Sequence, residues 1–357
     1  MKVYEKYIII NFLKSFLYIT CVFFSFVFVI NLLAELDFFK NYNVSTGLIL
    51  YLNLLNSPSL IFEMFPFIFL ISTQFFFIKL LKSDEIQIFK YSGIKNTKIL
   101  VILIFTSFMV SILIVTLFQT ISSNNKNLYL EIKSTYSNDG KYLAVITKNG
   151  LWIKDKIENR NYIINANKIK DNYLIDTIIS ELNDDNKLIK TIISKKINIS
   201  NKQWEIINPK IIKNNFQFNE DIIHLKFNFD YEKIQTLFSN LSSLSFLELL
   251  SLKKNYQSLN ISTTEIDVEI QKLISYPIYL ILMTILSTIV MINTKKIKSI
   301  TFKIGIGFFI SIIIFYFNNF FNVLGKTEKI DFMYSIWTPI ILLLVFNILS
   351  LNKINDK

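Results

Sequence analysis

Six apolar runs, each long enough to cross a bilayer as a helix, constrain the fold of this chain more than any other feature. About 20 residues at helical rise cover the ~30 Å hydrocarbon core of a membrane. The first run is too long for a removable signal peptide and lacks a small-residue cleavage site, so we expect it to be retained. We therefore expect a membrane α-helical protein with six transmembrane helices in a 3+3 arrangement around an inserted domain. The runs cover residues 7–34, 58–81, 99–121, 273–292, 302–321 and 335–351.

The lysines near these runs predict the orientation of the chain. They are concentrated in the loop that joins the second and third runs and in the loop that joins the fourth and fifth. Short loops rich in Lys and Arg stay in the cytoplasm, whereas long segments cross regardless of charge. Both termini are therefore expected to be cytoplasmic, and segment 122–271 is expected to lie outside. The lysines of the two loops are Lys79, Lys82, Lys90, Lys95, Lys98, Lys295, Lys296, Lys298 and Lys303.

The long polar segment has the pattern of a β domain. Short runs rich in Ile, Tyr and Trp alternate with Asn, Asp and Gly, which is typical of strands and turns. Examples are KYLAVITKNGLWIKDK, RNYIINANKIK, YLIDTIISEL, KLIKTIISKKINIS and KQWEIINPKIIK. Near residue 230 the apolar spacing becomes helical. The pattern predicts transmembrane helices in residues 1–121 and 273–357, a β sandwich or roll in residues 122–230, and a helical connector in residues 231–272.

The loop at residues 79–98 combines many charges with well-spaced apolar residues. This pattern predicts a short amphipathic helix at about residues 83–93, which ends at Gly93. Such a helix suits a groove on a partner protein. The alternative is a solvated or lipid-surface loop whose lysines snorkel. Its apolar residues are Ile86, Ile88 and Phe89, and its neighbouring charged residues are Asp84, Glu85 and Lys90.

The composition argues against a catalytic or metal site. The chain has one cysteine, Cys21, and one histidine, His224, so neither a disulfide framework nor a Cys/His metal site is expected. The GKT at residues 325–327 resembles the end of a P-loop, but Phe320 occupies the position of the required earlier glycine. The net charge of +11 is explained by lysines around membrane helices, so no nucleic-acid partner is expected. We expect a non-catalytic protein without a cofactor.

Five stretches of the chain together resemble the lipopolysaccharide-export permeases LptF and LptG, the YjgP/YjgQ type. SLIFEMFPFIFLISTQFFFIKLLKSDEIQIFKYSGI resembles the second span and coupling helix of that family, with Pro66, Glu85 and the turn Ser92-Gly93-Ile94 at matching places. NGLWIKDKIENRNYIINANKI and NKQWEI resemble its outer domain, and SYPIYLILM and SIWTPIILLLVFN its fourth and sixth spans. The resemblance covers essentially the whole chain. EMFPF and IWTPI are nearer to LptG.

The resemblance implies a transport subunit in the bacterial inner membrane. Such permeases pair with a homologous chain, bind a cytoplasmic LptB-like ATPase dimer through their coupling helices, and extract lipopolysaccharide. A periplasmic β-jellyroll then passes the lipid to LptC/LptA-like bridge proteins. On this view Glu85, Ile86, Ile88 and Phe89 transmit the closure of the ATPase, and Gly93 forms the turn that follows.

The resemblance also implies a lipid cavity whose lateral gates are formed by the first and fifth spans. Phe315 and Phe320 on the fifth span are candidates for contact with acyl chains, and Lys40, after the first span, is the third candidate residue of the cavity. Near the outer end of the first span the family's better known members carry several basic residues, whereas here only Lys40 is basic and Glu35 and Asp37 are acidic. Two other classes remain open. One is a permease or mechanotransmission subunit of another ABC system, and the other is a membrane-anchored receptor or assembly factor without an ATPase.

Overall fold

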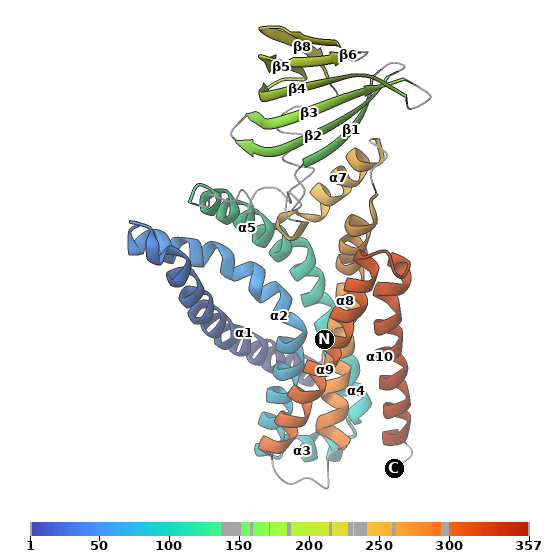
Figure 1. The fold of residues 1–357 in the computed structure, drawn as a ribbon. Helices are drawn as coiled ribbons and strands as arrows, with labels where there is room; N and C mark the ends of the chain where they lie inside the picture. The colour runs from blue at the N-terminus through green and yellow to red at the C-terminus, as the bar shows by residue number, and fades with distance from the viewer. Residues whose placement is uncertain are drawn as a thin grey trace. The chain divides into compact units, whose positions relative to one another are not determined.

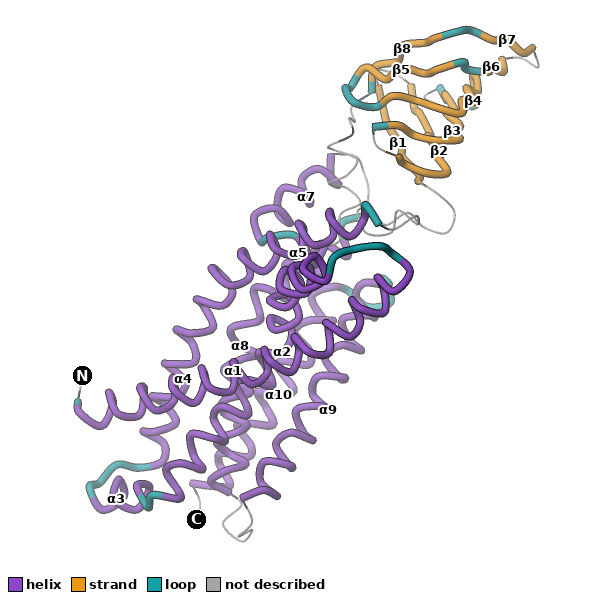
Figure 2. The backbone as a smooth tube through the Cα atoms, turned by 90° about the vertical axis from the view of Figure 1, so that its left-hand side faces the viewer, coloured by secondary structure: helices purple, strands orange, loops and turns teal. Residues whose placement is uncertain are grey.

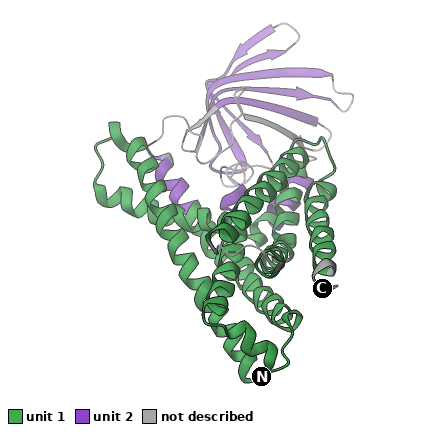
Figure 3. Cartoon of the chain, turned by 90° about the horizontal axis from the view of Figure 1, so that it is seen from below, with its two compact units in different colours: residues 1–126, 245–249, 263–357 green, residues 127–244, 250–262 purple. Residues whose placement is uncertain are grey.

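The structure, a computed structural model, describes residues 2–136, 151–157, 160–170, 172–183, 187–213, 216–227, 231, 241–258, 262–293 and 300–355. The chain divides into two compact units, shown in different colours in Figure 3. We call residues 1–126, 245–249 and 263–357 the helical unit, and residues 127–244 and 250–262 the sheet unit. Lys295, Lys296 and Lys298, and residues 141–150 of the first expected strand, lie outside the described residues.

Six helical segments among the described residues are long and apolar enough to cross a membrane. This confirms the six apolar helices predicted from the sequence. They cover Val3–Asn41, Thr46–Lys82, Asn96–Lys133, Thr264–Ile292, Thr301–Lys326 and Phe332–Leu351. The helical elements, of which Figure 1 labels the α-helices, are α1 (Val3–Phe38), η1 (Phe39–Asn41), α2 (Thr46–Lys82), α3 (Glu85–Tyr91), α4 (Asn96–Leu113), η2 (Ile114–Phe118), α5 (Gln119–Ser134), η3 (Leu241–Ser243), α7 (Phe246–Ser258), α8 (Thr264–Asn293), α9 (Ile300–Lys326) and α10 (Phe332–Asn355).

Several helices extend beyond the apolar runs. α2 begins at Thr46, where the Ser45 hydroxyl accepts a hydrogen bond of 3.3 Å from the Leu48 amide and caps the helix. α4 continues through the π-helical turn η2 and through α5 to Ser134. No Gly or Pro lies between residues 94 and 139, so nothing in the sequence interrupts this helix. Residues 122–134, for which we expected β structure, are therefore helical.

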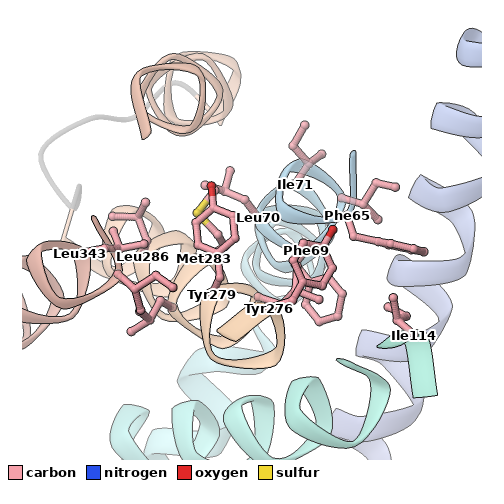
Figure 4. Packing of buried hydrophobic residues seen from close by; sticks show 14 of the residues in the cluster. Phe65, Phe69, Leu70, Ile71, Ile114, Tyr276, Tyr279, Met283, Leu286 and Leu343 are labelled. Atoms are coloured by element: carbon pink, nitrogen blue, oxygen red, sulfur yellow. The ribbon is translucent and has the colours of Figure 1, made fainter. Parts of the chain in front are cut away.

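The core of the helical unit lies around α8, which packs against α2, α4, α9 and α10. Its aromatic and aliphatic side chains meet those of α2 in a large buried cluster, shown in Figure 4. Phe62 of α2 stacks on Tyr276 of α8 with ring centroids 4.8 Å apart, and the Tyr276 hydroxyl donates to the Phe62 carbonyl. A backbone carbonyl that loses its hydrogen bond within a membrane helix needs another donor, because no water is present there to replace it.

Polar side chains connect the helices at several points inside this core. Ser287 of α8 donates to the Leu70 carbonyl at 2.7 Å, and Gln74 of α2 donates to the Lys303 carbonyl at 3.0 Å. At the α1–α2 contact, three buried asparagines form a ladder. Asn31 donates to Asn53 at 2.5 Å, and Asn56 donates to Asn31 at 3.0 Å. Each such bond between membrane helices contributes about 0.6 kcal/mol, so the ladder fixes the register of α1 on α2.

The sheet unit contains one antiparallel sheet of eight strands, drawn in orange in Figure 2. Its order is β1-β2-β3-β4-β5-β8, and β6 pairs with β4 and with β7. The predicted strand segments coincide with β1 to β6, whereas β7 and β8 were not singled out in the sequence. The jellyroll form stays a prediction. The strands are β1 (Leu151–Ile157), β2 (Arg160–Lys170), β3 (Tyr173–Leu182), β4 (Leu188–Asn198), β5 (Gln203–Ile207), β6 (Lys210–Lys213), β7 (Phe216–Asn219) and β8 (Ile222–Lys226).

One face of this sheet is buried. The side chains at the centre of this face are apolar, and charged side chains lie at one end of it. Trp204 is fully buried and packs on Phe227 with ring centroids 4.4 Å apart. Glu181 is buried on the same face, where the Arg160 guanidinium donates to it and the Lys190 ammonium lies 3.0 Å away. Its cross-strand neighbour Tyr162 has a pKa raised by burial. The two cations offset the desolvation of the buried carboxylate.

Candidate coupling site at helix α3

The predicted amphipathic helix is present as α3, a short helix with a loop on each side (Figure 2). Asp84, at the residue before it, has a left-handed backbone with φ of 54°, which turns the chain out of α2. At the other end, Ile94 donates its amide to the Phe89 carbonyl at 2.8 Å, and Gly93 donates to Lys90 at 3.0 Å. With Gly93 at φ of 75°, these two bonds form a Schellman cap. The sequence correctly predicted Gly93 as the end of the helix.

Replacing Gly93 with Ala should loosen the end of α3, because a left-handed backbone costs a non-glycine residue about 1–2 kcal/mol. A Cβ built at Gly93 meets no atom within 4 Å, and neither does one at Gly305 inside α9. Gly305→Ala is therefore a matched control that adds the same methyl group without the backbone strain, and it should be neutral or slightly stabilising.

The measurement is hydrogen exchange of the α3 amides in the full chain. Gly93→Ala should speed exchange about 5- to 30-fold, the factor that corresponds to 1–2 kcal/mol. Gly93→Asn should restore most of the protection, because asparagine tolerates the left-handed region. If the Ala variant exchanged like the original chain, the cap would not hold the helix.

The two sides of α3 have different surroundings. Ile86 and Phe89 are half-buried and pack against a cluster of the helical unit that includes Ile8, Phe77 and Leu103. Ile88 is 59% exposed and is not among the residues of this cluster. Of the apolar residues predicted to couple to a partner, two therefore fix the helix to the bundle and one is free to contact another protein.

Tyr91 is a candidate contact residue that the sequence reasoning missed. It is 88% exposed and lies three residues after Ile88, so both side chains share one side of the helix. This i, i+3 spacing was visible in the sequence and could have identified it. Ile88 and Tyr91 are therefore the apolar residues on the exposed side of α3, next to the exposed polar residues Gln87 and Lys90.

Glu85, in the first turn of α3, accepts a hydrogen bond of 2.8 Å from the Tyr7 hydroxyl of α1. Its carboxylate is half-buried. The residue predicted to receive the motion of a partner is thus also bonded to the first helix of the chain.

The three residues predicted for a lipid cavity lie on two helical elements, α9 and η1. Phe315 of α9 packs on Phe67 of α2, with ring centroids 5.3 Å apart. Phe320 of α9 is exposed and contacts Phe321. Lys40 is exposed in η1. The structure brings the fifth apolar helix onto the second through Phe315, but it does not test the lipid-binding role of these three residues.

No site for a metal ion was found in the described part of the chain, where groups of three or more His, Cys, Asp and Glu side chains were sought. The comparison with curated proteins gave no significant match. The family model described as lipopolysaccharide export system permease LptF/LptG matches residues 6–353. The chain belongs to the LptF/LptG permease family.

Membership of the LptF/LptG family accounts for the main features of the fold. With its apolar helices, it identifies a multi-pass membrane protein that carries a sheet domain. The family is the permease of the lipopolysaccharide export system, which works with partner proteins. A permease subunit fits a non-catalytic role.

Proposed function

We propose that this LptF/LptG family member is a permease subunit of an ABC-type exporter that extracts lipopolysaccharide from the bacterial inner membrane. It pairs with a homologous permease chain, and a separate LptB-like ATPase dimer supplies the energy. The sheet unit is the periplasmic β-jellyroll, which passes the lipid to LptC/LptA-like bridge proteins. The observation that carries the proposal is α3, which is fixed to the bundle by Ile86 and Phe89 and exposes Ile88 and Tyr91.

The charge distribution supports the orientation in this proposal. Lys79, Lys82, Lys90 and Lys95 lie on or beside α3, and short lysine-rich loops stay in the cytoplasm. We infer that both termini are cytoplasmic, that the six spans form a 3+3 arrangement, and that the sheet unit is periplasmic. α3 then lies on the cytoplasmic side of the membrane, where ATP is present.

The finer assignments rest on the resemblance of particular residues. Pro66 within α2 and Pro339 within α10 belong to the stretches EMFPF and IWTPI, and they favour LptG over LptF. We further propose that Phe315 and Phe320 contact acyl chains and that Lys40 contacts the head group. Phe315 already lies against α2, so it is placed to respond when α9 moves relative to that helix.

Native mass spectrometry of the gently solubilised full chain, purified from its own host, tests the proposed function. We expect one copy of the chain with one homologous permease, two copies of a soluble ATPase and bound glycolipid. A chain recovered alone would favour the receptor or assembly factor without an ATPase. Recovery with an ATPase but with another cargo would favour a different ABC system.

A further inference from the structure

The first three turns of α1 contact the loop that carries α3, from a distant part of the sequence. Tyr7 donates to Glu85 at 2.8 Å, and its ring meets the Phe89 ring edge-on with centroids 6.4 Å apart. Tyr4 lies under the Lys98 ammonium, 5.3 Å from the ring centroid. The start of α1 therefore contacts both α3 and the segment that follows it.

The same side of α1 also contacts the segment that precedes α3. Asn11 accepts a hydrogen bond of 2.8 Å from the Lys79 ammonium in the last turn of α2. Ile8 and Phe12 are fully buried in the cluster that receives Ile86 and Phe89. Residues 4, 7, 8, 11 and 12 fall on one face of a helix with 3.6 residues per turn. This face holds the start of α1 in a defined register against α3.

Tyr7 is the residue of this face that bonds directly to the helix proposed to receive the ATPase. Its ring could pack on Phe89 without the hydroxyl, so the hydroxyl adds a directional link. A bond from a neutral donor to a carboxylate is stronger than one between neutral groups. Tyr7 is 40% exposed, so water competes for the same carboxylate and the link can be made or released without a large penalty.

We propose that Tyr7 is a positioning residue for coupling: its hydroxyl holds the Glu85 carboxylate and transmits displacement of α3 to α1. The inference rests on the proposed function, because it assigns a second role to the same carboxylate. α1 continues as one helix for 36 residues, and the asparagine ladder ties it to α2 beyond its middle. Displacement of α3 is therefore transmitted to the start of α1 as well as to α2 and α4.

The test uses the complete complex reconstituted in vesicles that contain the host's lipopolysaccharide. Tyr7→Phe removes the hydroxyl and keeps the ring. Tyr18→Phe, on an exposed side of the same helix, is the matched control. We expect Tyr7→Phe to lower the lipid extracted per ATP hydrolysed by about three- to tenfold, as expected for the loss of one partly exposed bond to a carboxylate. Tyr18→Phe should stay within twofold of the original chain.

A second comparison separates positioning from general helix stability. In a Glu85→Ala background the carboxylate is already absent, so adding Tyr7→Phe should cause no further loss. An equal loss from Tyr7→Phe in both backgrounds would overturn the inference, and so would original coupling in the single variant. Failure of the unaltered complex to extract lipid would instead contradict the proposed function itself.

Discussion

Glu85→Lys should reduce lipid extraction by the reconstituted complex at least about tenfold. The substitution removes the acceptor of the Tyr7 hydroxyl and replaces an acidic residue in the first turn of α3 with a basic one. Loss of this partly exposed bond accounts for about a three- to tenfold reduction, and an acid in the first turn of a helix contributes about 0.3–1 kcal/mol more. A loss of 1.4 kcal/mol corresponds to a factor of ten. The reversed charge also alters the surface that α3 presents to the ATPase.

The matched control is Gln87→Lys, which adds a positive charge to the same helix at an exposed position. It leaves the Tyr7–Glu85 contact intact and changes the charge only on the exposed surface of α3, so it should lose clearly less extraction than Glu85→Lys. Lipid release per ATP hydrolysed is measured for both variants, after native mass spectrometry confirms that each complex assembles. Extraction by Glu85→Lys at the original rate would rule out a coupling role for this residue and would favour the lipid-surface interpretation of α3.

Trp204→Ala should destabilise the sheet unit by about 3–5 kcal/mol, the usual loss for a fully buried large aromatic side chain. Trp204 is 0% exposed, and its ring packs on Phe227, which in turn packs on Tyr162 with centroids 5.4 Å apart. Removing the indole leaves a cavity beside Phe227 on the buried face. Because domains are stable by only about 5–15 kcal/mol, this loss should unfold the sheet unit in a measurable fraction of molecules.

Phe216→Ala is the control, because Phe216 is also aromatic but is 70% exposed on β7. It should change the stability by less than about 0.5 kcal/mol, as for other exposed positions. Hydrogen exchange of β2 to β5 in the full chain measures both effects. Equal protection in the two variants would show that the buried face does not depend on Trp204.

The proposed function makes the sheet unit the route for lipid, so the Trp204 variant also connects stability to transport. If the proposed function holds, partial unfolding of the sheet unit should lower release to the bridge proteins while leaving the ATPase bound at α3. Loss of the ATPase from the Trp204→Ala complex would instead indicate that the sheet unit and the helical unit unfold cooperatively.

Most of the helices and strands of this chain could be predicted from its sequence. Apolar runs of membrane length gave the six helices, and alternating Ile and Tyr residues gave β2 and β3 with bounds that match the structure. Gly93 ended α3 as expected. These features depend on neighbours within a few residues, where backbone sterics and the helical or strand period act directly. The prediction was wrong for the segment beyond residue 121, which is helical. Its polar composition resembles that of the β domain, although no Gly or Pro interrupts the helix.

The candidate coupling site required the tertiary structure. The sequence placed Ile86, Ile88 and Phe89 together as one apolar set, but only packing against α1, α2 and α4 shows that Ile88 is exposed and the other two are not. Tyr7 and Glu85 are 78 residues apart, and nothing local to either indicates that they meet. The sequence by itself determined the membrane helices, strands β1 to β6 and the family, since these follow from local periodicity and motif order. The tertiary structure decided which side of α3 is free and which residue holds its carboxylate, because those depend on contacts between helices that are distant in the chain.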